Sequence, residues 1–200
     1  MYKTLKFSKE DVDKLYFTSD SHYGHHNICR STTRWTGASY DSTREFNSLE
    51  DMNLRLIQAI NNTVPPDGIL FHNGDIAFGS DQNIPRFIKQ LNVKEIHLIV
   101  GNHDKNVKYH KNLFKTVNDC VMIEIGKLQS IWLSHYAHRV WPSAHKGVWH
   151  LYGHTHDTLE NYGKSMDVGV DTNRPTFAPY SFKEIKKVLD KQENIHSINA

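Results

Sequence analysis

The 200-residue sequence predicts an α/β fold, a sandwich in which two mixed β-sheets pack on each other and are flanked by α-helices. Short apolar, β-prone runs recur along the chain, and six of them stop at a polar cluster rich in His, Asp or Asn. Helical patterns separate the first three runs, which is typical of parallel strands joined by crossovers. An alternating segment in the second half indicates an antiparallel hairpin and a second sheet.

Each predicted element has its own signal in the sequence. The six strand-like runs are residues 15–22, 69–75, 96–104, 130–135, 148–156 and 165–171. Ser48 is a candidate N-cap for a helix that should end near Asn61. A second helix should begin around Asp81, because apolar residues then recur at helical spacing.

The hairpin and the last helix are marked by short local patterns. The turn of the hairpin is expected near Gly126, between two alternating stretches. Near the end of the chain, Ser181 and Glu184 form a capping box that precedes an amphipathic helix. No repeat or flexible linker interrupts the chain, so residues 1–200 are expected to form a single domain.

Composition excludes several classes of protein. A hydrophobic content of 38% and a charged content of 23% fit a globular protein without a membrane-length apolar run. The N-terminal segment lacks the apolar core of a secretory signal, so a cytoplasmic location with no membrane association is expected. Cys29 and Cys120 are far apart and are expected to be reduced thiols. With a net charge of +2 and scattered basic residues, a nucleic-acid substrate is allowed but not indicated.

Histidine is the unusual residue of this composition, because the chain contains 14 and they gather where the predicted strands end. Ligands bind at the carboxyl ends of strands in open α/β sheets, so these polar clusters should meet in space. The metal-ligand candidates are Asp20, His22, Asp75, Asn102, His135, His154 and His156. Seven candidates with mixed nitrogen and oxygen character fit two divalent ions better than one, with Asp75 as the bridge.

The same residues carry a resemblance to a known family. The motifs DSH at 20–22, GD at 74–75, GNHD at 101–104, the single His135 and GHTH at 153–156 occur in this order. In this series the chain resembles the calcineurin-like metallophosphoesterase superfamily over residues 15–171, and within it a group of small bacterial and phage phosphoesterases. The resemblance implies a metallophosphoesterase-type sandwich and two divalent metal ions, with Mn²⁺ favoured and Fe²⁺, Zn²⁺ or Ni²⁺ compatible with the ligands.

Residue roles follow from the resemblance, motif by motif. It implies that Asp20, His22, Asp75 and His156 hold one metal. It implies that Asp75, Asn102, His135 and His154 hold the other. His103 would face the phosphate as an acid or as a stabiliser of charge, and Asp104 would orient it.

The expected function is hydrolysis of a phosphodiester of nucleotide or nucleic-acid type, by attack of a hydroxide that bridges the two metals. The segment GDIAFG lacks the arginine that follows this motif in serine/threonine protein phosphatases, which disfavours that class. A phosphomonoesterase or pyrophosphohydrolase acting on a small nucleotide is the alternative within enzymes. A non-catalytic metal-binding scaffold of the same fold is the alternative outside them. The oligomeric state is left open.

For several other residues, a functional role and a purely structural role are both considered. His25 is a candidate phosphate contact or an exposed loop residue, and Arg139 is a candidate contact for an anionic substrate. Asp167 and Asp171 are candidates to accept a hydrogen bond from a ligand histidine. The four tryptophans are expected in the core or in a pocket wall rather than as platforms for bases. Walls of the substrate site are expected from residues 29–47 and 136–146.

Overall fold

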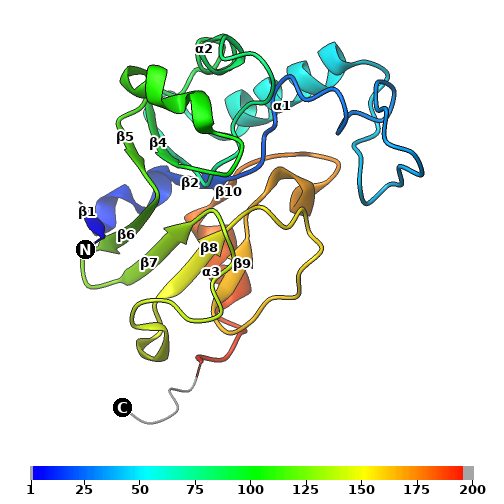
Figure 1. Cartoon of the computed structure of the whole chain (residues 1–200). Helices are drawn as coiled ribbons and strands as arrows, with labels where there is room; N and C mark the ends of the chain where they lie inside the picture. The colour runs from blue at the N-terminus through cyan, green and yellow to red at the C-terminus, as the bar shows by residue number, and fades with distance from the viewer. Residues whose placement is uncertain (1, 196–200) are drawn as a thin grey trace.

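The computed structural model describes residues 2–195 and consists of two five-stranded β-sheets with few helices (Figure 1). Met1 and residues 196–200 of the predicted domain lie outside the described part. In spatial order the first sheet contains β1 (Lys3–Phe7), β6 (Cys120–Ile125), β7 (Gln129–Ser134), β8 (Trp149–Tyr152) and β9 (Ser165–Asp167). The second contains β10 (Tyr180–Ser181), β2 (Leu15–Thr18), β3 (Ile69–His72), β4 (Glu95–Ile99) and β5 (Thr116–Asn118).

Within residues 2–195, three α-helices and five short 3₁₀-helices connect or cover these strands. The α-helices are α1 (Leu49–Thr63), α2 (Asn83–Ile88) and α3 (Phe182–Leu189). The 3₁₀-helices are η1 (Lys9–Lys14), η2 (Lys105–Tyr109), η3 (Lys111–Leu113), η4 (Ala144–Lys146) and η5 (Val170–Asn173). Within residues 2–195 none of the helices has the length and apolar character needed to cross a membrane.

Strand pairing confirms the predicted topology in its main features. β2, β3, β4 and β5 are parallel neighbours, with α1 and α2 in the connections between the first three. β6 and β7 form the predicted antiparallel hairpin, and β7, β8 and β9 then run parallel. Because parallel strands end at the same edge, the polar clusters that follow β2, β3 and β4 lie together.

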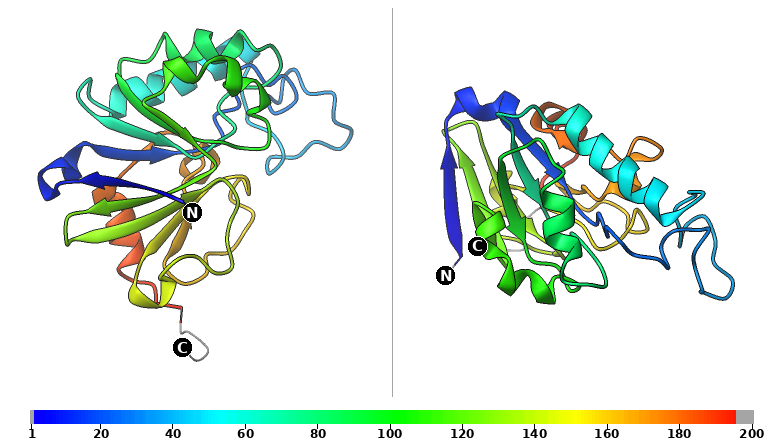
Figure 2. Two further views of the ribbon diagram at one scale, coloured as in Figure 1. Left: turned by 60° about the vertical axis from the view of Figure 1, so that its left-hand side comes forward. Right: turned by 90° about the horizontal axis from the view of Figure 1, so that it is seen from above.

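The hydrophobic core lies between the two sheets and continues beneath the helices. Leu15, Phe17 and Phe71 of the second sheet pack against Ile123 and Leu133 of the first, and all five are fully buried. The amphipathic helices α1 and α2 cover the outer face of the second sheet, and α3 packs beside β2, β9 and β10 (Figure 2). The predicted helix caps are confirmed, since Ser48 accepts from the Asp51 backbone N–H and Ser181 forms a capping box with Glu184.

The outer face of the first sheet is covered by the 136–148 segment, which contains η4, and not by an α-helix. Trp132 and Trp141 are buried there beside His150, which is fully buried. The His150 Nε2 accepts from the His138 backbone N–H at 3.0 Å, and its Nδ1 donates to the Trp132 carbonyl at 3.2 Å. These two bonds hold the imidazole in its neutral form, and burial lowers the pKa of His150 to about 3.

The free energy of unfolding is expected to fall in acid partly because of His150. Its pKa is about 3 in the folded protein and about 6.5 in an unfolded chain, so between these pH values only the unfolded chain binds the proton. Stability from this group is therefore complete above pH 6.5, and about 2 kcal/mol of it is lost by pH 5. Urea unfolding of His150→Gln should show a correspondingly shallower pH dependence between pH 7 and 5. Parallel curves for the variant and the wild type would contradict this assignment.

Candidate metal centre

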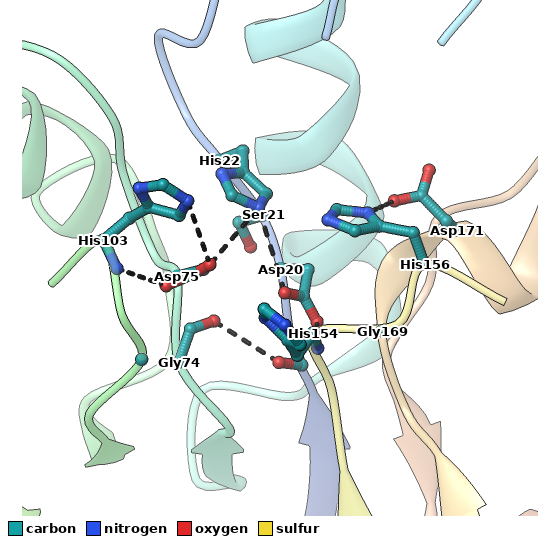
Figure 3. Close-up of polar contacts among 12 residues, drawn as sticks. Asp20, Ser21, His22, Gly74, Asp75, His103, His154, His156, Gly169 and Asp171 are labelled. Carbon is teal, nitrogen blue, oxygen red and sulfur yellow. Dashed lines mark hydrogen bonds and ion pairs between the residues drawn. The ribbon is translucent and has the colours of Figure 1, made fainter. Parts of the chain in front are cut away.

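The loops that follow five strands bring the predicted metal ligands together at one edge of the two sheets (Figure 3). The side chains form two groups. Within each group, the possible ligand atoms all lie within 4.8 Å of one another. The first group is Asp20, His22 and His156. The second group is Asp75, His135 and His154. Residues separated by more than 130 positions in the sequence thus form one site.

Asp75 belongs to the second group and also lies beside the first, as expected for a bridging carboxylate. Its Oδ2 is 3.6 Å from the Nε2 of His22 in the first group and 3.5 Å from the Nε2 of His135 in the second. The Nε2 of His135 is also 2.9 Å from the Oδ1 of Asn102, which places the predicted amide ligand beside the second group. All seven predicted ligands therefore belong to one continuous site.

Several polar atoms of the site have no protein partner, although they are buried. Among the described residues, the Asp20 Oδ1 and both ring nitrogens of His22 make no hydrogen bond. Unpaired buried polar atoms cost free energy, and a cation bound between them would satisfy them. Imidazole and carboxylate donors are also the ligand set that suits divalent transition metals. The residues therefore fit two metal ions.

At the site, several residues adopt a left-handed backbone conformation that residues other than glycine rarely adopt. Asp20, His22, Asp75, His154 and His156 all have a positive φ, between 49° and 70°. Each residue in this conformation lowers the stability of the fold by of order 1–3 kcal/mol. It persists only because the surrounding structure holds it in place. Five of the seven predicted ligands have this strained backbone. This indicates that the fold fixes the orientation of their side chains.

Two glycines of the motifs are required by close approach to the carboxylates. A Cβ at position 101 would overlap with the Oδ1 of Asp75, and a Cβ at position 153 would overlap with the Oδ2 of Asp20. The His154 backbone N–H donates to the same Oδ2 at 2.8 Å, so the chain passes directly against this carboxylate. Only glycine allows this contact.

Gly153→Ala is expected to weaken metal binding at the Asp20 group, because the added methyl group would overlap with the Ser19 Oγ and with the Oδ2 of Asp20. Overpacking of this kind also costs about 1–3 kcal/mol of unfolding free energy. Calorimetric titration with Mn²⁺ measures the first effect and urea unfolding the second. Gly37→Ala adds the same methyl group where nothing lies within 4 Å, and it should leave Mn²⁺ affinity unchanged. Equal affinities for Gly153→Ala and the wild type would contradict the prediction.

Hydrogen bonds on the far side of two imidazoles direct their Nε2 atoms to the site. The Nδ1 of His156 donates to the Oδ2 of Asp171 at 2.7 Å, and the Nδ1 of His135 donates to the Asn73 carbonyl at 2.8 Å. Such partners fix the tautomer of a ligand histidine and its orientation. Asp171 thus has the role that the sequence suggested, whereas Asp167 accepts from the Thr155 hydroxyl and from backbone N–H groups instead.

Arg44 is a buried part of the site that sequence reasoning missed. Its side chain is fully buried and donates to both carboxylate oxygens of Asp171, at 2.9 and 2.7 Å, and to the carbonyls of Asp20 and Ser21. Arg174 donates to the other side of Asp171 at 2.7 Å. Burial alone would raise the pKa of Asp171, but Arg44 and His156 hold it well below its usual range.

Electrostatics of the site reflect many charges in a small buried volume. Burial raises the pKa of Asp20 to about 7, against the lowering effect of His156 and His135. Burial disfavours protonation of His135, but Asp75 and Asp20 outweigh it and raise its pKa to about 9. The carboxylates therefore attract positive charge to the position between the two groups, which is the condition for binding cations.

His103 and Asp104 are adjacent but differ in environment. The His103 side chain is 41% exposed, and its Nε2 lies 3.9 Å from the Oδ2 of Asp75. Asp104 is buried, and its two oxygens accept from the backbone N–H groups of Asp75, Ile76 and Gly101. The predicted orientation of His103 by Asp104 is therefore corrected. Asp104 instead fixes the turn that carries Asp75, because its oxygens accept three backbone N–H groups, including those of Asp75 and Ile76.

The two candidate substrate contacts have different positions. His25 is buried beside the site, with its ring stacked on Phe78 at 3.7 Å, and burial lowers its pKa to about 4. Arg139 is not among the described residues that line the cavity beside the metal-ligand candidates, and its guanidinium lies over the Tyr162 ring at 4.3 Å. Its assignment as a substrate contact is corrected for this reason.

A cavity of about 730 Å³ opens beside the metal-ligand candidates. Trp35, Asp41 and Ser42 line it from the 29–47 segment, as predicted. The lining also includes His154, Thr155, His156, Thr158 and Leu159, and among the described residues none of 136–146 lines this cavity. Tyr136 belongs to a separate cavity of about 330 Å³ beside His135.

Comparisons with known proteins agree with the fold. No protein-family profile matches the chain. The chain is 27% identical over 192 residues to the uncharacterized protein MJ1445 of Methanocaldococcus jannaschii, covering 93% of this chain and 97% of the relative. Among solved structures it is similar to the protein of unknown function AQ665 from Aquifex aeolicus, with a TM-score of 0.62 and 22% identity. That match covers 87% of this chain and 98% of the other, and it confirms the two-sheet α/β sandwich.

Proposed function

We propose that this protein is a metal-dependent phosphoesterase that hydrolyses a phosphodiester. The observation that carries the proposal is the position of Asp75 between two groups of histidine and carboxylate ligands. Two divalent cations held there would neutralise the charge of a phosphoester and lower the pKa of a water molecule enough to supply hydroxide near neutral pH. The histidine and carboxylate ligands suit Mn²⁺, Fe²⁺, Zn²⁺ or Ni²⁺, and Mn²⁺ is the metal that the family resemblance favours.

The protein's own groups would bind and orient the phosphate. His103 borders the large cavity, and its backbone N–H donates to the Oδ1 of Asp75 at 2.8 Å, which fixes its position relative to the ligands. Its partly exposed ring is free to donate a proton to a leaving oxygen or to stabilise charge on the phosphate. No side-chain nucleophile is needed, since water attacks the phosphorus.

Hydrolysis of two model substrates tests the proposal. Purified protein loaded with Mn²⁺ should hydrolyse bis-p-nitrophenyl phosphate faster than p-nitrophenyl phosphate, measured as release of p-nitrophenolate. Faster hydrolysis of the monoester would favour a phosphomonoesterase. Two bound Mn²⁺ ions per chain without hydrolysis of either substrate would indicate a metal-binding scaffold and contradict the proposal.

His103→Ala is expected to lower turnover about 10²- to 10⁴-fold while metal content stays at the wild-type level. The reason is that His103 borders the cavity and has no ligand role in either metal group. Metal analysis and the diester assay on the same sample separate the two effects. His145→Ala, at an exposed histidine outside the site, is the matched control and should keep full activity. Full activity of His103→Ala would remove the acid role.

A further inference from the structure

The cavity beside the metal-ligand candidates has an aromatic wall that the proposed chemistry does not use. Trp35 is 44% exposed and lines this cavity, whereas Trp132, Trp141 and Trp149 are buried in the cores. Aromatic side chains in the wall of a concave pocket are typical of sites that bind small ligands. Leu159, 51% exposed, lines the same cavity and adds a second apolar surface.

A row of rings connects Trp35 to the metal-ligand candidates. The rings of His22 and His25 are 5.3 Å apart, and those of His25 and Trp35 are 6.0 Å apart. His25 is fixed by its stacking on Phe78. One ring therefore separates Trp35 from a metal ligand, a spacing that a nucleoside can bridge when its phosphate lies at the metals.

Charge in the cavity favours an uncharged group beyond the phosphate. Among the described residues that line it, Arg174 is the one lysine or arginine. Its Nε and Nη2 donate to Asp171 and its Nη1 donates to two backbone carbonyls, so four of its five N–H groups are already in use. Asp41 adds a negative charge to the lining. A second phosphate would be repelled there, whereas a base with amino groups would be accepted.

From this arrangement we infer that the cavity is a nucleobase site in which Trp35 stacks on the base of a single nucleotide whose phosphoester lies at the metals. The inference rests on the proposed function and names its substrate class. Base stacking on an aromatic side chain tolerates any base, because each base has a π face. Asn27, Asp41 and Ser42 lie along the same lining and supply polar groups for the edge of the base.

Binding of two matched ligands tests the inference without measuring turnover. AMP and ribose 5-phosphate share the sugar and the phosphate and differ in the base. Calorimetric titration of the Mn²⁺-loaded protein should show AMP binding at least about fivefold more tightly. Trp35→Ala should abolish this difference, and Trp35→Phe should keep part of it, since phenylalanine retains a stacking face. Tyr109→Ala removes an aromatic ring that is 67% exposed outside the cavity, and it should keep the full difference.

Fluorescence gives a second readout that depends on Trp35 itself. AMP should quench the emission of the exposed indole in the wild type but not in Trp35→Phe, and ribose 5-phosphate should quench neither. Equal affinities for the two ligands, or an unchanged preference in Trp35→Ala, would overturn the base site even if bis-p-nitrophenyl phosphate is hydrolysed. A base-dependent preference without diester hydrolysis would support the base site and count against the proposed reaction alone.

Discussion

Asp75→Asn is expected to abolish both metal binding and phosphodiester hydrolysis. The His103 backbone N–H donates to the Oδ1 of Asp75, so the amide oxygen of an asparagine would occupy that position. The amide NH₂ would then take the place of Oδ2, which lies 3.6 Å from the Nε2 of His22 and 3.5 Å from that of His135. Two N–H donors would point to the position where both cations need a shared anion.

Metal affinity is the measurement that decides this prediction. Loss of a residue that only orients a ligand weakens metal binding about 10- to 100-fold, and loss of the bridging ligand should exceed the upper value. Metal analysis after gel filtration should therefore find no retained Mn²⁺ in Asp75→Asn, and the diester assay should find no turnover. The near-ultraviolet circular dichroism of the metal-free variant should match that of the wild type, which separates loss of metal from loss of fold.

Asp119→Asn is the matched control, because it makes the same chemical change at an exposed aspartate outside the metal groups. It should retain both metal and activity. Wild-type Mn²⁺ affinity in Asp75→Asn would show that the two groups of ligands are not joined by this carboxylate, and the dinuclear proposal would fail.

The ligand set was predictable from sequence because its signal is local. Each candidate follows an apolar run within a few residues, and Gly101 and Gly153 mark the places where the backbone passes against a carboxylate. The parallel order of β2, β3 and β4 then requires the clusters to meet at one edge. Local patterns together with strand direction were therefore enough to place all seven ligands in one site.

Features that depend on the packing of distant segments were not predictable in this way. β1 is a short edge strand with two exposed lysines and three half-buried residues, so its sequence carries little of the apolar signal that marks the buried strands. Asp104 follows His103 directly, yet its carboxylate turns to three backbone donors, one beside it and two about 28 residues away. Arg139 follows the His135 loop but lies against Tyr162. Closeness in sequence was misleading for both side chains.

Arg44 is the clearest case, because its charged partner is 127 residues away and nothing near it in sequence indicates burial. Its guanidinium forms a two-pronged pair with Asp171 and also donates to the carbonyls of Asp20 and Ser21. It therefore connects the partner of His156 to the backbone of the first metal group. A planar fork of donors is needed for this, and a lysine ammonium does not provide it.

Arg44→Met is accordingly expected to lower the free energy of unfolding by about 3–5 kcal/mol, the usual result of removing one partner of a buried ion pair. Two carbonyls would lose their donor, and Asp171 would keep only Arg174 and His156 as charged partners. Urea unfolding of the metal-free protein measures the effect.

Two variants set the scale for that loss. Arg55→Met removes a half-buried arginine whose hydrogen bond is to the Pro175 carbonyl, and it should change stability by no more than about 0.5 kcal/mol. Arg44→Lys should recover only part of the loss, because a single ammonium group cannot pair with both Asp171 oxygens and reach both carbonyls. If Arg44→Met proved as stable as Arg55→Met, the buried arginine would not hold the first metal group in place.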